Sequence, residues 1–451
     1  MRVVIDPRRT GVLHRIGGDL LIGLAAVIAG ACSYSTTGRF YNQIAILLGT
    51  IVLVAVVLIG WRPRVHPVTV ILAAFGSLFV QLYKPPKGNV DRTGGFWWVL
   101  GLAAVATVVV AVLALWTGRS VLPRRWSVSA WVGVSVVLAA CVVGVVACSG
   151  SPQIDVWQIF QQSSAGLFHG VNPYEITSFT GIPKGQTANC FNYLPATFLS
   201  TWPGWLLLHD ARYSEVAILL LGWVILGWTV LRRSVEPRPA LMLLAVSLSL
   251  IGTLRVGQQA WNESLLLGFV LIAVCAAATG RTVWLVIALG LALATKQHMA
   301  LLLPVMVMWP QLGWRRTGYS IGVAALVSGP WLLWNPQRFK ACTVDFFTKG
   351  IARFDSISLW HFVPEAIAPV VIVLAIGAAY YLAYRFLPRD LGGLLIGFAL
   401  VLFAFDLFNK QSFENQWWFA CELIVCGLLL QVAELRLGRS ATPSSVESQA
   451  G

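Results

Sequence analysis

The sequence predicts an all-α protein that crosses a membrane many times. Of its 451 residues, 57% are hydrophobic and only 11% are charged, whereas about a quarter of the residues in a soluble domain are charged. Apolar runs of roughly the 20 residues that a membrane helix needs recur along the chain. These runs do not alternate with a period of two, which excludes the strands of a membrane barrel.

Clusters of Arg and Lys between the apolar runs predict the topology, because short cytoplasmic loops carry an excess of both residues. These loops also account for much of the net charge of +14, so the charge does not indicate a nucleic-acid partner. The pattern gives about 14 crossings with both termini in the cytoplasm. The predicted crossings are 18–34, 42–60, 67–83, 96–116, 127–148, 213–231, 240–254, 262–279, 282–294, 299–309, 317–334, 366–384, 391–408 and 417–433.

Residues 193–208 are apolar but do not fit this count, because a crossing there would place Arg232 and Arg233 outside. Pro195 and Pro203 interrupt the run, which predicts a re-entrant or two-part hairpin. A full crossing stays open as the alternative.

The predicted topology places most of the unusual polar residues on the outer face. They lie in loop 149–192, Arg255–Glu263, Thr295–Met299, loop 335–365 and Asn409–Asn415. The cytoplasmic loops, by contrast, are short and basic. We therefore expect a site at the outer face, and a disordered cytoplasmic tail over 435–451.

Asp155 begins a polar stretch just after the fifth apolar run. Apolar residues at helical spacing follow it while the glutamines face elsewhere, which predicts an amphipathic helix on the membrane surface. Two interpretations of Asp155 stay open. It is either the N-cap of that helix, paired with Gln158 in a capping box, or a general base whose pKa burial would tune.

Other polar motifs also have a bland and a functional interpretation. Gly170 and Pro173 end the amphipathic helix. The segment "RVGQQAWNE" (Arg255–Glu263) offers a guanidinium and amides to phosphate or sugar oxygens, or anchors a helix at the interface. Lys296 lies in apolar sequence, where an unpaired ammonium is costly, so it either reaches the surface or has an anionic partner such as a phosphate.

Loop 335–365 mixes charged and aromatic residues, so it is either a binding lid or a solvated loop. Four charged residues near the C-terminal helices are equally consistent with ion pairs between helices: Asp406, Lys410, Glu414 and Glu422. The sequence has no Walker or Rossmann glycine pattern, no HExxH and no GxSxG. We expect no cofactor and no metal site.

In order, these motifs resemble one family. An Asp follows a membrane helix; "GVNPY" (Gly170–Tyr174), "YLP" (Tyr193–Pro195), "GQ" (Gly257 and Gln258) with Asn262, and "KQH" (Lys296–His298) follow. The pattern is similar to family 87 of the GT-C glycosyltransferases, which includes mannosyltransferases that use polyprenol-phosphate-mannose and related arabinofuranosyltransferases. The resemblance covers roughly 150–430. About four additional spans precede the Asp, so residues 1–120 form an added membrane module before a catalytic core over 121–434.

The resemblance implies a multi-pass enzyme of the bacterial cell membrane that acts at the outer face. It implies transfer of a sugar, with mannose favoured over arabinofuranose, from a polyprenyl-phosphate donor to a glycolipid or polysaccharide of the cell envelope. Inversion by single displacement needs one carboxylate base, unlike the pair in a glycosidase. Asp155 would be the base, and Lys296, His298 and Arg255 would hold the phosphate. The residues implied for the sugar or acceptor are Gln258, Asn262, Asn172, Tyr174, Tyr193 and Gln297.

Cys190 and Cys342 would both face the oxidising exterior, which favours a disulfide between the two outer loops. Two rival functions stay open: a transporter or flippase of a lipid-linked sugar, which should have polar residues at the midplane of several helices, and a non-catalytic assembly partner.

Overall fold

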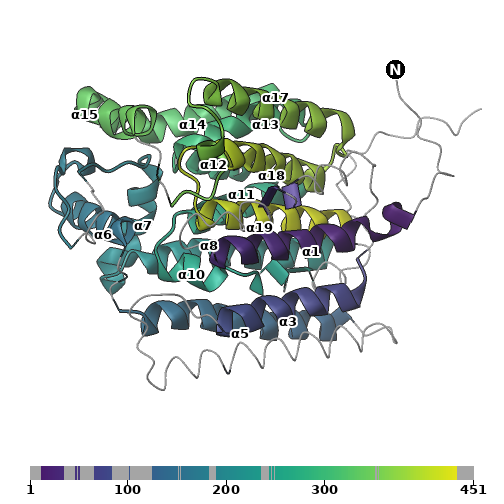
Figure 1. Ribbon diagram of the computed structural model, residues 1–451. Coiled ribbons are helices and arrows are strands. Elements are labelled where there is room, and N and C mark those ends of the chain that lie inside the picture. Colours follow the sequence, from purple (N-terminus) through teal and green to yellow (C-terminus); the bar gives the residue numbers. More distant parts are fainter. Residues whose placement is uncertain are drawn as a thin grey trace, which may run out of the picture.

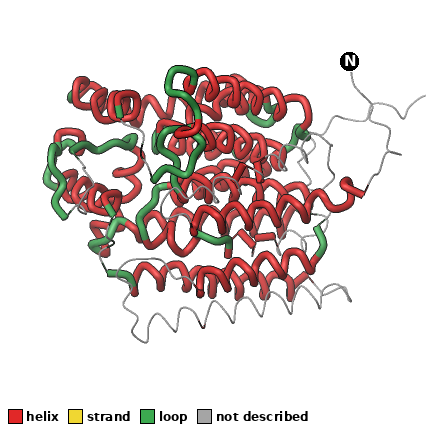
Figure 2. Tube along the Cα trace, in the orientation of Figure 1, coloured by secondary structure: helices red, strands yellow, loops and turns green. Residues whose placement is uncertain are grey.

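The described part of the chain is a bundle of helices, without a strand among those residues (Figures 1 and 2). The computed structural model describes residues 12–34, 46–47, 49–50, 65–83, 101, 124–150, 152, 154–181, 189–234, 243–244, 246–247, 249–350, 353 and 355–433. The longer helices are α1 (Val12–Tyr34), α3 (Pro67–Tyr83), α5 (Arg124–Cys148), α8 (Arg212–Arg233), α11 (Glu263–Ala278), α12 (Thr282–Leu293), α14 (Gly313–Trp334), α17 (Ala368–Phe386), α18 (Leu391–Phe408) and α19 (Glu414–Val432).

Shorter elements lie between the long helices. They are α6 (Asp155–Phe168), η1 (Pro173–Glu175), α7 (Ala196–Leu208), α10 (Thr253–Gln258), η2 (Gln297–Leu302), α13 (Leu303–Met308), α15 (Pro336–Lys340), η3 (Ala341–Asp345), α16 (Phe346–Lys349) and η4 (Trp360–Phe362). Helices α6, α7 and α15 gather at one end of the long helices, on the left in Figure 1. This end carries segments from both predicted outer loops, 149–192 and 335–365, and is called the outer end after that prediction.

The described helices include membrane-length elements. Three of them, α8, α17 and α18, are long and apolar enough to cross a membrane. Helices α18 and α19 are buried along most of their length, whereas α14 and α17 expose large aliphatic side chains such as Leu326, Leu333 and Val373, each more than 65% exposed. An exposed aliphatic surface of this kind is expected where a helix faces lipid.

Close packing between two helix pairs depends on glycine. A Cβ on Gly268 of α11 would lie 2.6 Å from the carbonyl oxygen of Ile218 in α8, and a Cβ on Gly392 of α18 would lie 2.5 Å from that of Gly427 in α19. Small residues let the backbones of membrane helices approach this closely. These pairs hold the centre of the bundle, to which the outer end is attached.

Several predicted crossings match the helices closely. Helices α3 and α18 cover the predicted runs 67–83 and 391–408 residue for residue. The run 299–309, predicted as a crossing, instead folds as η2 and the six-residue α13. Pro304 explains the division, because proline is accommodated in the first turn of a helix and disrupts its interior. Most of the runs 42–60 and 96–116, most of the predicted module 1–120, part of 240–254 and the tail 435–451 lie outside the described residues.

The two-part hairpin expected at 193–208 does not form, and re-entry of this segment into the membrane stays a prediction. Residues 196–208 form one helix, α7, with Pro203 inside it. At about 1.5 Å per residue its 13 residues reach only roughly 20 Å, which is too short for a crossing. Helix α7 continues past Pro203 because it packs on α6 and α8, and the Gly204 N–H donates to Ser214 Oγ at 2.6 Å instead.

Candidate active site at the outer end of the bundle

Asp155 lies at the first position of α6, not at its N-cap. The N-cap is Ile154, which has extended backbone angles and no side-chain cap bond, so the predicted capping box with Gln158 does not form. Asp155 Oδ1 instead accepts from the Val156 N–H at 2.9 Å. The predicted amphipathic helix is confirmed, with Ile159, Phe160 and Ser163 buried. It ends at Phe168 with His169 as its C-cap, and the next residue, Gly170, turns the chain with a φ of +74°.

The environment of Asp155 favours its protonated form. Burial raises the pKa of the Asp155 carboxyl, and the Val156 N–H and the positive charge of Arg353 oppose this only in part. A partly buried carboxylate with a raised pKa is a stronger proton acceptor than one in water. This is the property that a general base at the outer end would need.

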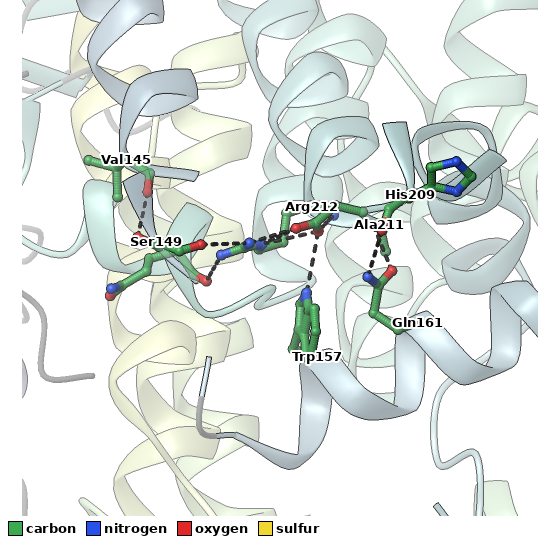
Figure 3. A network of polar contacts seen from close by, with 9 residues as sticks. Val145, Ser149, Trp157, Gln161, His209, Ala211 and Arg212 are labelled. Atoms are coloured by element: carbon green, nitrogen blue, oxygen red, sulfur yellow. Dashed lines mark hydrogen bonds and ion pairs between the residues drawn. The ribbon is translucent and has the colours of Figure 1, made fainter. Parts of the chain in front are cut away.

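Helix α6 is fixed to the bundle through a buried arginine (Figure 3). The Arg212 side chain is 3% exposed and binds Asp210 through Nε and Nη2, the latter at 2.6 Å from Oδ2. Its other guanidinium bonds reach the carbonyl of Ser149 after α5 and that of Gln258 in α10, both at 3.1 Å. Arg212 thus joins α5, α8 and α10.

Two side chains of α6 reach the same turn. Trp157 Nε1 donates to Asp210 Oδ1 at 3.3 Å, and the Gln161 amide binds His209 and Ala211 through their main-chain atoms. The glutamines of α6 therefore serve as attachments. We call the Asp210–Arg212 pair with Trp157 and Gln161 the Arg212 clamp. It fixes the position of the helix that begins with Asp155.

A cluster of buried aromatic side chains packs against α6, the helix that begins with Asp155. Tyr174 is fully buried against Phe191, Phe198 and Phe339, and its hydroxyl donates to the Tyr193 carbonyl at 2.8 Å. Asn172 is also fully buried, and its Oδ1 accepts from the Tyr174 N–H. These two residues, predicted for sugar or acceptor, shape the loop that carries Tyr193.

Tyr193 links this cluster to the charged residues. Burial raises the pKa of its hydroxyl, and the nearby negative charges of Asp155 and Glu263 raise it further. The Lys296 ammonium lies 5.8 Å from the centre of its ring. Tyr193 is therefore near both the predicted base and the predicted phosphate-binding lysine.

The predicted disulfide is confirmed. Cys190 and Cys342 are bonded, with Cα atoms 5.4 Å apart, and both are buried. The bond joins the two outer loops across 152 residues of sequence. Gln297 adds a second link, because its Nε2 donates to the carbonyls of Asn192 and Thr343.

Breaking this disulfide should lower the stability of the outer end. In the double variant C190A/C342A we expect the free energy of unfolding to fall by about 2–4 kcal/mol, because a long loop in the unfolded chain is released. Thermal unfolding with and without reductant measures the change, and reductant should no longer shift the variant. Mass mapping of the peptides under non-reducing conditions would contradict the bond if it found both thiols free.

Lys296 and Arg255, two of the residues predicted to hold the phosphate, each pair with a carboxylate. Lys296 pairs with Glu263 Oε1, and Asn415 Nδ2 donates to the other oxygen, Oε2, at 2.6 Å. Arg255 Nη1 lies 2.7 Å from Glu414 Oε2. Glu414 and Asn415 are consecutive in the first turn of α19, so one turn connects the two pairs.

The remaining predicted residues surround these pairs. His298 stacks on Phe405 with ring centroids 6.3 Å apart. Gln258 is 2% exposed, and its Oε1 accepts from Gln259. Asn262 is 1% exposed, and its Nδ2 has no hydrogen-bond partner among the described residues. Nδ2 of the buried Asn172 is likewise without a hydrogen-bond partner among the described residues.

Sequence reasoning missed several residues of this site. Arg353 in loop 335–365 binds Asp355 at 2.6 Å and lies within the electrostatic range of Asp155 and Tyr193. Glu263 stood in a quoted motif but was given no role. A lysine in apolar sequence needs an anion, and Glu263 is an acid at the start of an apolar run. Together these two features could have indicated the Lys296–Glu263 pair. Asp210 and Arg212, two residues apart just before the apolar run 213–231, could likewise have indicated their ion pair.

The question of ion pairs between helices has a mixed outcome. Glu414 does pair with Arg255, whereas the Glu422 carboxylate accepts from Ser247 Oγ at 2.6 Å. Lys410 donates to the carbonyls of Thr348 and Gly350, which ties loop 335–365 to the start of α19. In the part of the chain that the structure describes, no group of three or more His, Cys, Asp or Glu side chains could hold a metal ion.

Comparison with known proteins gives little. No family model matches the chain, and no curated protein matches it. Among solved structures, the crystal structure of ArnT from Cupriavidus metallidurans bound to undecaprenyl phosphate is similar, with a TM-score of 0.43 and 18% sequence identity. The match covers 69% of this chain and 60% of that chain.

Proposed function

We propose that the protein is a membrane glycosyltransferase that moves a sugar from a polyprenyl-phosphate donor to a glycolipid or polysaccharide of the cell envelope. The observation that carries the proposal is the partly buried carboxylate of Asp155, with its raised pKa, near Tyr193, whose ring lies 5.8 Å from the Lys296 ammonium. A base and cations placed together suit a reaction in which a hydroxyl loses a proton and a phosphate leaves.

The chemistry assigns one role to each group. Asp155 takes the proton of the acceptor hydroxyl while that oxygen attacks the anomeric carbon. The bond between this carbon and the phosphate oxygen breaks, and polyprenyl phosphate leaves with the electron pair. A single displacement of this kind inverts the anomeric configuration. Lys296, Arg255 and His298 stabilise the leaving phosphate, so it needs no general acid.

The polar side chains around the pair would orient the sugar. Asn262 offers its unpartnered Nδ2, and Gln258, Gln297 and Tyr193 lie on segments that meet at the same end. We expect Asn172 and Tyr174 to act through the position of Tyr193, because their side chains are fully buried. Mannose is the favoured sugar and arabinofuranose the alternative. The site would face outward, with both termini in the cytoplasm.

The arrangement of charges supports an enzyme over a transporter. In the four helices α8, α17, α18 and α19, charged side chains lie near the helix ends, apart from Glu422. A transporter is expected to carry polar residues at the midplane of several helices. The catalytic proposal therefore fits the described helices better.

A transfer assay with defined donors tests the proposal. The purified protein in lipid would be incubated with labelled polyprenyl-phosphate mannose or polyprenyl-phosphate arabinose and a glycolipid extract. We expect labelled product from one donor. No transfer from either donor, by folded protein that still binds the lipid, would contradict the enzyme and favour the transporter.

A further inference from the structure

Two of the cations proposed to hold the phosphate are already paired with carboxylates. Lys296 carries Glu263 as its partner, and Arg255 carries Glu414. An anionic ligand that approaches either cation meets a carboxylate already in contact with it. A phosphate that binds at this place therefore competes with these carboxylates for the same positive charges.

Glu263 is held more completely than a surface ion pair would be. Its side chain is 0% exposed, and each of its two oxygens has a partner, Lys296 on one side and Asn415 on the other. Lys296 is 9% exposed. A buried ammonium needs an anion beside it, because water is not there to solvate it. Glu263 supplies this anion.

The Lys296 ammonium also has a second neighbour. It lies 5.8 Å from the centre of the Tyr193 ring, and the charges of Asp155 and Glu263 both act on the Tyr193 hydroxyl. A lysine has a flexible four-carbon stem and three rotatable donors, so its ammonium can turn from one neighbouring anion to another. Lys296 can therefore exchange Glu263 for an anion placed near Tyr193 without a change in the helices.

We propose that Glu263 is the resident anion of Lys296 and that the phosphate of the polyprenyl lipid takes its place, so that Glu263 competes with the lipid phosphate and promotes its release. The inference rests on the proposed function. The donor is a phosphodiester with one negative charge, whereas the product is a monoester with a charge of about −1.5 to −2 near pH 7. The product would bind the cations more tightly than the donor unless a competing anion returned.

Binding of polyprenyl phosphate tests this competition. The affinity of the full chain in lipid nanodiscs would be measured for polyprenyl phosphate, with the uncharged polyprenol as the control ligand. In E263Q we expect phosphate binding about tenfold tighter than in wild type, while polyprenol binding is unchanged. Product inhibition of transfer should strengthen by the same factor. The exposed carboxylate of Glu365, replaced in E365Q, controls for the loss of one negative charge from the outer face.

A second variant covers the case in which E263Q does not fold, because that change leaves Lys296 buried without its anion. Asn415→Ala keeps the ion pair but removes the amide that holds Glu263 Oε2. It should tighten phosphate binding by a smaller factor, about threefold. In both variants polyprenyl phosphate should raise the Tm more than it raises that of wild type, because a ligand that binds the folded protein more tightly stabilises it more.

The outcomes separate the two proposals. If wild type binds polyprenyl phosphate and E263Q and N415A bind it no more tightly, Glu263 is a fixed structural partner and the competition is wrong. If no protein distinguishes polyprenyl phosphate from polyprenol, the proposed function fails together with the inference.

Discussion

Replacing Asp155 by Asn is expected to reduce sugar transfer by a factor of about 10² to 10⁴, the range that a general base contributes. The amide has the size of the carboxyl and still accepts a hydrogen bond from the Val156 N–H, so α6 should begin as before. What it cannot do is take up a proton. Initial rates of transfer at a saturating donor concentration measure the effect.

The same substitution should make the protein more stable near neutral pH. Burial raises the pKa of Asp155 in the folded protein, so its ionisation costs folding free energy, and asparagine removes that cost. The stability of the wild type relative to D155N is therefore highest below about pH 3.9, the ordinary pKa of an aspartate. It is lost as the pH rises through the higher folded-state pKa. Thermal unfolding across this window measures the difference.

The transfer rate of the wild type should follow the opposite trend, rising with pH as Asp155 loses its proton. Asp345 offers the matched control. It lies in the second outer loop and pairs with Lys340 and Lys349, so D345N should leave the rate within a factor of about two. Full transfer by D155N would return Asp155 to a purely structural role at the start of α6.

Replacing Arg212 by Met is expected to lower the free energy of unfolding by about 3–5 kcal/mol. The change leaves the Asp210 carboxylate without its guanidinium in a largely buried place. It also removes the donors to the Ser149 and Gln258 carbonyls. Lysine should rescue little, since one ammonium cannot make the paired bonds of a planar guanidinium.

The effect on Asp155 distinguishes a clamp from a general stabiliser. Hydrogen exchange over 155–168 should accelerate in R212M more than exchange over α18, because Trp157 and Gln161 lose the turn to which they bind. The double variant D210N/R212M should recover part of the stability, since no charge is then left unpaired.

Arg232, at the other end of α8, is the matched control. It lies over the Trp228 ring at 4.2 Å, and it is exposed. R232M should change stability by less than about 1 kcal/mol. Equal losses in R212M and R232M, with unchanged exchange over α6, would contradict the clamp.

The sequence by itself determined the elements of this protein and the surfaces they bury. Apolar runs predicted α3 and α18 to the residue, helical spacing predicted the amphipathic α6, and Gly170 predicted the turn that follows it. Hydropathy and periodicity report how each segment meets its surroundings, which is a local property. The disulfide between Cys190 and Cys342 also followed, because the topology placed both thiols on the oxidising side.

Only the tertiary structure decided which charges meet. Lys296 was expected to need an anion, but its choice of Glu263, 33 residues away, and the bond from Asn415 to Glu263 across 152 residues depend on how helices pack. The continuation of α7 past Pro203 and the occupied hydroxyl of Tyr174 have the same origin. Periodicity gives the face of a helix that is buried but not the residue opposite it, and partner choice in the site is made across those faces.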